Sequence, residues 1–163
     1  MTTKVAVVGA TGTMGRLVTR LVEASDEFEL VASIGSKQPL SDMLGADLVV
    51  DVTVPAVSQG VVDFAVANGI NVLVGTSGWS SERIVTLEHL LADVPGVGVV
   101  IIPNFSVGSV LATSFAAMAA RFFDSIEIVE AHRSSKIDSP SGTAVRTAEI
   151  GRASCRERVS RSV

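Results

Sequence analysis

Short runs of β-branched and aliphatic residues recur along the first hundred residues of this chain. Each run stops at or just before a glycine, a proline or a threonine, and the runs occupy residues 4–8, 29–34, 47–53, 71–74 and 97–102. Continuous apolar runs of this length, bounded by turn residues, are typical of strands that are buried on both faces. The segments between them carry apolar residues at helical spacing. The pattern therefore predicts alternating strands and helices over residues 1–123.

Residues at the expected helix boundaries support this alternation. Pro55 suits the first turn of a helix, and Asn68-Gly69 is typical of a helix end. Ser81 is expected to cap a helix over residues 82–92, and a long alanine-rich helix is expected to end at Phe123. Strands and helices in strict alternation indicate an α/β fold with a doubly wound parallel sheet.

A polar cluster that is unlike the rest of the chain lies at residues 130–144. Residues 125–132 are expected to form a further strand that leads into it, and the cluster contains His132 and Lys136. Within it, Pro140-Ser-Gly-Thr143 is typical of a turn that opens a helix. Backbone N–H groups at a helix start, together with serine and threonine hydroxyls, form an anion site. A polar loop with a helix cap is the alternative interpretation.

A glycine-rich turn joins the first expected strand to the first expected helix. Its sequence has the spacing G-x-x-G-x-x-G. In nucleotide-binding proteins the first glycine permits a tight turn, the second lets the backbone approach a pyrophosphate, and the third lets the helix pack on the strand. A βα turn without a ligand is the alternative. The candidate cofactor-binding residues of the turn are Gly9, Ala10, Thr11, Gly12, Thr13, Met14 and Gly15.

Other loops that follow the strands are expected at the same edge of the sheet, where ligands bind in open α/β folds. They add further candidates for cofactor binding: Thr53, Gly75, Thr76, Ser77, Pro103, Asn104 and Phe105. After the second strand, Ser36 and Lys37 stand where an NAD site usually has an acidic residue. We therefore expect these two residues to receive the 2′-phosphate of NADPH, with NADH as the alternative cofactor. The alternative is that Lys37 is a solvated loop lysine without a role in binding.

Composition and charge exclude several classes of protein. The formal net charge of −4 and the pI of about 5.1 argue against nucleic-acid binding as the main task. The apolar stretches are shorter than the roughly 20 residues that span a bilayer, and we expect no signal peptide. The single cysteine, Cys155, provides neither an internal disulfide nor a cysteine-based metal site. The expectation is a cytoplasmic protein without a metal, a membrane partner or a nucleic-acid partner.

The last residues, 151–163, depart from the pattern of the preceding chain. They switch to arginine and serine and lack a clear apolar period. We expect this tail to be disordered and to be a non-native or frame-shifted end. A basic binding tail is the alternative.

Four blocks of sequence together resemble the 4-hydroxy-tetrahydrodipicolinate reductase (dihydrodipicolinate reductase) family of bacterial lysine biosynthesis. They are Gly9–Arg16, Gly75–Gly78, Pro103–Gly108 and residues 130–144, of which the last is similar to the family signature E-x-H-x-x-x-K-x-D-x-P-S-G-T-A. The resemblance implies a Rossmann-like dinucleotide-binding domain over residues 1–124. It also implies the beginning of an α+β substrate-binding and tetramerisation domain over residues 125–150, because chains of the family continue well beyond that point.

The activity implied by the resemblance is the NAD(P)H-dependent reduction of a cyclic imine dicarboxylate, 4-hydroxy-tetrahydrodipicolinate. His132 matches the general acid, and histidines titrate near neutral pH, as this task requires. Lys136 matches the catalytic lysine, whose ammonium offsets the substrate's charge. Ser141, Gly142 and Thr143 match the residues that hold a substrate carboxylate. Arg133 stands where the family has a second histidine, and its guanidinium can bind a carboxylate bidentately.

The resemblance further implies a homotetramer for full-length members of the family rather than for this chain. Two other functions are alternatives: a non-catalytic NAD(P)-binding module, such as a redox sensor of the atypical short-chain type, and an inactive fragment of the enzyme. The block from His132 to Ala144 favours the enzyme, because a sensor needs no histidine and lysine before an anion-binding helix start.

Overall fold

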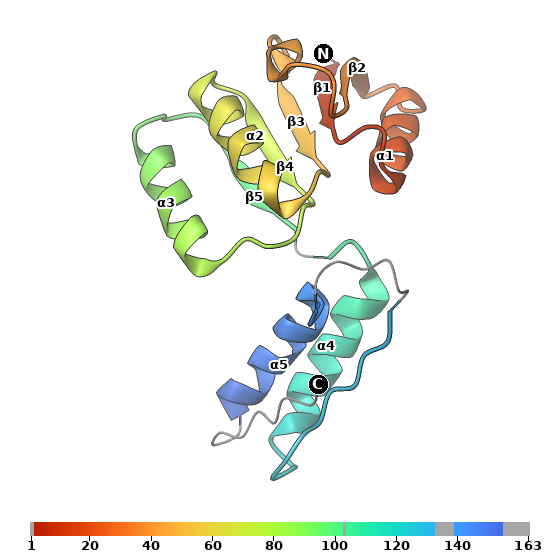
Figure 1. Cartoon of the computed structure of the whole chain (residues 1–163), viewed down its shortest axis with the longest axis vertical. Coiled ribbons are helices and arrows are strands. Elements are labelled where there is room, and N and C mark those ends of the chain that lie inside the picture. Colours follow the sequence, from red (N-terminus) through yellow and green to blue (C-terminus); the bar gives the residue numbers. More distant parts are fainter. Residues whose placement is uncertain (1, 103, 133–138, 155–163) are drawn as a thin grey trace. The chain divides into compact units, whose positions relative to one another are not determined.

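The computed structural model describes residues 2–102, 104–132 and 139–154. By their contacts the residues form two compact units, Met1–Ile102 and Pro103–Val163. Figure 1 shows the elements of both units along the chain.

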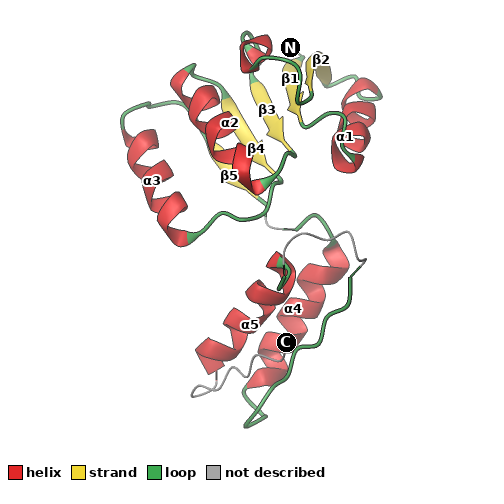
Figure 2. Ribbon diagram, viewed as in Figure 1, coloured by secondary structure: helices red, strands yellow, loops and turns green. Residues whose placement is uncertain are grey.

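The first unit is built on a parallel sheet (Figure 2). Within the described part of this unit the sheet has five strands in the order β2-β1-β3-β4-β5, and every neighbouring pair is parallel. The strands are β1 (Thr3–Val8), β2 (Phe28–Ile34), β3 (Leu48–Asp51), β4 (Asn71–Val74) and β5 (Val99–Ile101). All five lie where the sequence predicts them, and the α/β fold class is confirmed. The direction of the strand order reverses between β1 and β3, which makes this the topological switch point of the sheet.

Helices cover both faces of the sheet. The helices of the first unit are α1 (Thr13–Glu23), α2 (Pro55–Ala67), α3 (Ser81–Ala92) and a short 3₁₀ helix, η1 (Leu40–Met43). Val5 and Val7 of β1 belong to a buried cluster with Val22 of α1. The alternate residues, Ala6 and Val8, belong to a larger cluster that includes α2 and Leu87 of α3. Burial on both faces explains why the central strands β1, β3 and β4 are largely apolar.

The cap of α3 is one residue earlier than predicted. Ser80 precedes the helix, and its Oγ accepts a hydrogen bond from the backbone N–H of Arg83 at 3.4 Å. Ser81 is the first helical residue, so the prediction that it caps the helix is wrong. A cap side chain must reach an N–H three positions ahead from outside the helix. Because Ser80 and Ser81 are adjacent, the sequence alone does not show which of them caps the helix.

Two helices pack together in the second unit. They are α4 (Val107–Ala120) and α5 (Gly142–Ser154), and the hydroxyls of Thr113 and Thr147 lie 3.4 Å apart between them. The sequence predicts that α4 belongs with the sheet, in a domain ending at residue 124, whereas its contacts group it with α5. In the described part of the chain, no helix is both long and apolar enough to cross a bilayer.

The strand expected at residues 125–132 is absent. The structure gives this segment no regular secondary structure. Apolar Ile126 and Ile128 do alternate with polar neighbours, as in a strand. A strand, however, is completed by backbone hydrogen bonds to a neighbouring strand, and the described residues of the second unit include none.

Helix α5 extends into the segment that the sequence analysis assigned to the tail. The helix ends at Ser154, so residues 151–154 are helical rather than disordered as expected. The remaining part of the predicted tail, residues 155–163, lies outside the described residues.

Candidate functional site

The strands of the first unit end in register at one edge of the sheet. A single row of paired residues crosses this edge: Ile34, Val8, Asp51, Val74 and Ile101. The loops that leave the row carry the first unit's predicted cofactor-binding residues: Gly9–Gly15, Ser36 and Lys37, Thr53, and Gly75–Ser77. The edge therefore brings together residues that are up to about seventy positions apart in the sequence.

The glycine turn after β1 is packed too closely to accept side chains at two positions. Gly9 has a φ of +88°, and a Cβ there would lie 2.5 Å from the carbonyl oxygen of Val52. A Cβ on Gly15 would lie 2.0 Å from the carbonyl oxygen of Gly9. The first contact holds the turn against the end of β3, and the second holds α1 against the turn. Both glycines are therefore required by packing in the folded chain.

Gly12 occupies a different position in the same turn. It is exposed and has an extended backbone that immediately precedes α1, with no side chain capping the helix. A Cβ on Gly12 would meet only the carbonyl oxygen of Gly9, at 3.3 Å. Backbone N–H groups in the first turn of a helix lack intrahelical partners and attract anions. The turn thus offers an accessible site for a phosphate group at the switch point of the sheet.

The loop after β2 lies against the glycine turn. A Cβ on Gly35 would be 2.9 Å from the side chain of Thr11, and the N–H of Gly35 donates to the Gln38 side chain at 3.0 Å. Ser36 and Lys37, the predicted 2′-phosphate ligands, are exposed in this loop.

Asp51, at the carboxyl end of β3, is a further candidate residue of the functional site, and it is not among the site residues predicted from the sequence. The residue is fully buried. Its carboxylate accepts hydrogen bonds from the N–H of Thr53 at 3.0 Å, from the hydroxyl of Thr53 at 2.6 Å, and from the hydroxyl of Ser58. Ser58 in turn accepts from the indole N–H of Trp79 at 3.1 Å. The Thr53 hydroxyl is 3.5 Å from that of Thr76, so Asp51 anchors a polar network around two predicted cofactor-binding residues.

A usable signal for Asp51 was present in the sequence. An acidic residue inside an otherwise apolar strand must be buried, and buried carboxylates are stable only when donors surround them. The nearby threonine and serine, two and seven positions later, are such donors.

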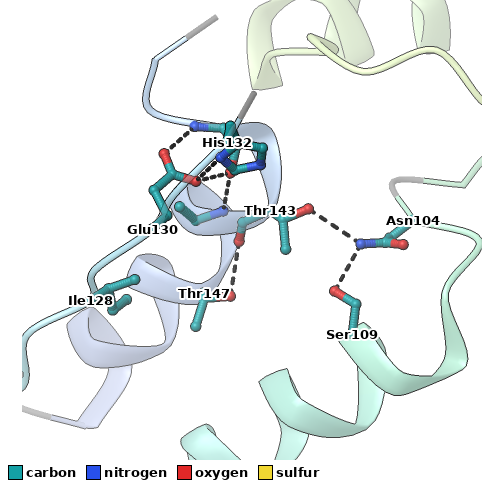
Figure 3. A pocket seen from close by; sticks show the side chains of 9 residues that line it. Asn104, Ser109, Ile128, Glu130, His132, Thr143 and Thr147 are labelled. Atoms are coloured by element: carbon teal, nitrogen blue, oxygen red, sulfur yellow. Dashed lines mark hydrogen bonds and ion pairs between the residues drawn. The ribbon is translucent and has the colours of Figure 1, made fainter. Parts of the chain in front are cut away.

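The second unit contains a pocket of about 280 Å³ beside the start of α5 (Figure 3). It is lined by Asn104, Ser109, Ile128, Glu130, His132, Ser141, Thr143, Ala144 and Thr147. His132, Ser141 and Thr143 were predicted to act on the substrate and Asn104 on the cofactor, so the pocket unites candidates from two separate blocks. Pro103, Arg133 and Lys136 are further predicted site residues, and they lie outside the described residues.

Ser141 and Glu130 form the most closely bonded part of this pocket. Ser141 is buried and caps α5: its Oγ accepts from the N–H of Ala144 at 3.1 Å. The Glu130 carboxylate accepts from the N–H of Ser141 at 2.7 Å and also from its hydroxyl. Both donors of Ser141 are thus engaged by a carboxylate of the chain itself. Gly142 and Thr143 are the next residues, and N–H groups in a first helical turn have no intrahelical partner.

His132 and Asn104 complete the polar lining. The Nδ1 atom of His132 is 3.5 Å from Oε2 of Glu130, and the histidine side chain is 42% exposed. Asn104 donates from its side-chain amide to the hydroxyls of Ser109, at 2.8 Å, and Thr143, at 3.2 Å. Phe105, the predicted neighbour of Asn104 in cofactor binding, is exposed and is not among the pocket residues.

A parallel sheet with a glycine turn at its switch point is the architecture of dinucleotide-binding α/β domains. Two family models match the chain: "Dihydrodipicolinate reductase, N-terminus" over residues 3–105 and "Dihydrodipicolinate reductase, C-terminus" over residues 108–162. The chain therefore belongs to the dihydrodipicolinate reductase family, and the resemblance noted in the sequence is confirmed.

Curated relatives and a solved structure agree with this family. The chain is 77% identical over 150 residues to a 4-hydroxy-tetrahydrodipicolinate reductase of Clavibacter sepedonicus, covering 92% of this chain and 54% of the relative. A Streptomyces griseus enzyme of the same name is 48% identical over 149 residues, which cover 90% of this chain and 60% of that enzyme. The dipicolinate-bound dihydrodipicolinate reductase of Paenisporosarcina sp. TG-14 superposes with a TM-score of 0.72 at 27% identity, covering 94% of this chain and 67% of that structure. The chain spans about half the length of the Clavibacter relative.

Proposed function

We propose that the protein, at the length of its curated relatives, reduces 4-hydroxy-tetrahydrodipicolinate with NAD(P)H to tetrahydrodipicolinate and water, in lysine (diaminopimelate) biosynthesis. The observation that carries the proposal is the pocket in which His132 lies beside the first turn of α5. A proton donor next to helix N–H groups that lack intrahelical partners suits a reaction in which a carboxylated ring must be bound and protonated. Membership of the reductase family supports this choice of reaction.

The first unit fits a pyridine dinucleotide. The turn from Gly9 to Gly15 leaves no room for side chains at its two ends, and its exposed middle precedes an uncapped helix. These features suit close approach of a pyrophosphate. Ser36 and Lys37, in a loop without an acidic residue, would hold the 2′-phosphate, so NADPH is the expected cofactor and NADH the alternative. The bound nicotinamide supplies the hydride.

The residues of the second unit would hold the substrate and deliver the proton. The N–H groups of Gly142 and Thr143, in the first turn of α5, would bind one substrate carboxylate, with Arg133 and Lys136 as the cationic partners proposed from the sequence. His132 acts as general acid: it gives its proton to the ring as hydride addition builds electron density there. Its partial exposure leaves a path by which solvent restores that proton.

The test uses a chain extended with the C-terminal region of the Clavibacter sepedonicus relative. NADPH oxidation is followed with freshly made substrate. We expect His132→Asn to lower kcat by about 10²–10⁴-fold, the range for a lost general acid. His89→Asn is the matched control, because His89 is the chain's other histidine and lies exposed in the last turn of α3. If the His132→Asn variant kept the kcat of the parent, His132 would not be the general acid. Absence of NADPH oxidation by the unmutated extended chain would contradict the function itself.

A further inference from the structure

Glu130 connects the start of α5 with His132 (Figure 3). Its Oε1 accepts the backbone N–H of Ser141, and its Oε2 accepts the hydroxyl of the same residue. Two donors from one buried residue fix both the position and the plane of the carboxylate. Oε2 is also the atom that lies 3.5 Å from Nδ1 of His132, so a fixed negative oxygen faces one particular nitrogen of the imidazole.

We propose that Glu130 is a positioning residue for His132 and sets which ring nitrogen exchanges the catalytic proton. In a histidine, the hydrogen bond made by one ring nitrogen decides which nitrogen carries the proton. A carboxylate can only accept, so the negative Oε2 of Glu130, 3.5 Å from Nδ1, favours the form of His132 that carries its hydrogen on Nδ1. Nε2 is then the nitrogen that gives up a proton and later regains it. This inference rests on the proposed function, in which His132 is the general acid.

The proton balance follows directly. The 4-hydroxyl of the substrate leaves as water, which gives the conjugated imine that accepts the hydride. The imidazolium carries hydrogens on both nitrogens, and its Nε2–H bond breaks as the proton passes to the substrate ring that has received the hydride. The product is a neutral imidazole with its hydrogen on Nδ1, which Glu130 stabilises without itself becoming protonated. Solvent then returns a proton to Nε2. In a serine protease, removing the carboxylate that fixes a tautomer in this way lowers kcat about 10⁴-fold.

A role for Glu130 in capping α5 explains only part of this geometry. A carboxylate near a helix N-terminus is stabilised by the helix dipole, and the bonds to Ser141 agree with such a role. Capping alone does not require Oε2 to face His132. The cap and the positioning role therefore predict different consequences when Ser141 and Glu130 are changed separately.

The tautomer of His132 can be read directly by ¹⁵N NMR of the 163-residue chain without substrate or cofactor. The chain has two histidines, so His89 serves as an internal reference. Above the pH at which the imidazoles are neutral, we expect His132 to show the Nδ1–H form.

In Glu130→Gln, the N–H of Ser141 still needs an acceptor and takes the amide oxygen, which turns the amide NH₂ toward His132. That donor favours a lone pair on Nδ1, and His132 should switch to Nε2–H. Glu127→Gln, an exposed position on the same segment, should change nothing.

A second variant separates positioning from capping. Ser141→Ala removes the hydroxyl that caps α5 but leaves the Glu130 carboxylate and the backbone N–H that holds Oε1. We expect the Nδ1–H form to persist in this variant, even where the signals of α5 show fraying. An Nε2–H form in the parent chain, or no switch in Glu130→Gln, would overturn the proposal, as would a switch in Ser141→Ala. Since no reaction is measured, a failure of the proposed function would leave these signals unchanged.

Discussion

Replacing Gly15 by alanine should destabilise the first unit, although the same replacement usually stabilises a helix. Gly15 lies in the first turn of α1. An added Cβ would be 2.0 Å from the carbonyl oxygen of Gly9 and 2.7 Å from Cα of Ala10. Both are backbone atoms, which cannot rotate away as the end of a side chain can. The helix would have to move off the turn, and its contact with β1 through Val22 would loosen.

The magnitude follows from two opposing effects. Overpacking a close contact costs about 1–3 kcal/mol, and the approach at Gly15 places it at the upper end of that range. Replacing a helical glycine by alanine stabilises the helix by about 0.5–1 kcal/mol. The expected net loss in the free energy of unfolding is therefore about 2 kcal/mol. Gly60 provides the matched control: it lies exposed in α2, and a Cβ there would have no atom within 4 Å. Gly60→Ala should thus be stabilising by the helix effect alone.

The assay is urea unfolding followed by the fluorescence of Trp79, which is the chain's only tryptophan. Trp79 packs against the larger buried cluster of the first unit and donates its indole N–H to Ser58, so its signal reports on that unit. We expect the midpoint to fall for Gly15→Ala and to rise for Gly60→Ala, with similar slopes. A midpoint for Gly15→Ala at or above that of the parent would refute the packing argument.

Three further predictions concern the buried network, the cofactor and the chain as it stands. Asp51→Asn should lower the free energy of unfolding in the same assay by about 1–3 kcal/mol. The reason is that one carboxylate oxygen, which accepts from Thr53 or Ser58, is replaced by an NH₂ group that can only donate. Unchanged stability would show that the charge of Asp51 is dispensable. Lys37→Ala should weaken NADPH binding but not NADH binding in fluorescence titrations, and an equal effect on both would remove the 2′-phosphate assignment. The 163-residue chain should bind NADPH without turning over substrate, since residues 125–132 are not held in a sheet; turnover within tenfold of the extended chain would contradict this.

The sheet and its glycine turn could be predicted from the sequence because their signals are local. The central strands β1, β3 and β4 are buried over most of their length, so their runs of apolar residues are nearly continuous and their ends are marked by turn residues. The requirement for glycine at positions 9 and 15 comes from contacts within a single βα unit and with the adjacent β3. A spacing pattern captures constraints of this kind, since the interacting residues are close in sequence or in neighbouring strands.

The strand expected at residues 125–132 shows what a local pattern does not contain. The alternation of apolar Ile126 and Ile128 with polar residues indicates that one face of the segment is apolar. It does not show whether a neighbouring strand is present to form hydrogen bonds with the segment. The second unit places this segment beside α5 instead, through the bonds between Glu130 and Ser141. Those two residues are eleven positions apart, and several other acidic and hydroxyl side chains lie nearby, so the sequence does not select this pair.

The same pair changes how the anion site at α5 must work. The family resemblance implies that Ser141 binds the substrate, yet both of its donors bind Glu130. A fixed carboxylate at that position offsets the roughly half positive charge of the helix N-terminus, so the helix by itself would attract a dicarboxylate only weakly. Among the described residues that line the pocket, His132 is the one side chain that can carry a compensating positive charge. Substrate binding and protonation would then depend on the same imidazolium, with Glu130 keeping it oriented and with the ammonium proposed for Lys136 supplying the remaining attraction.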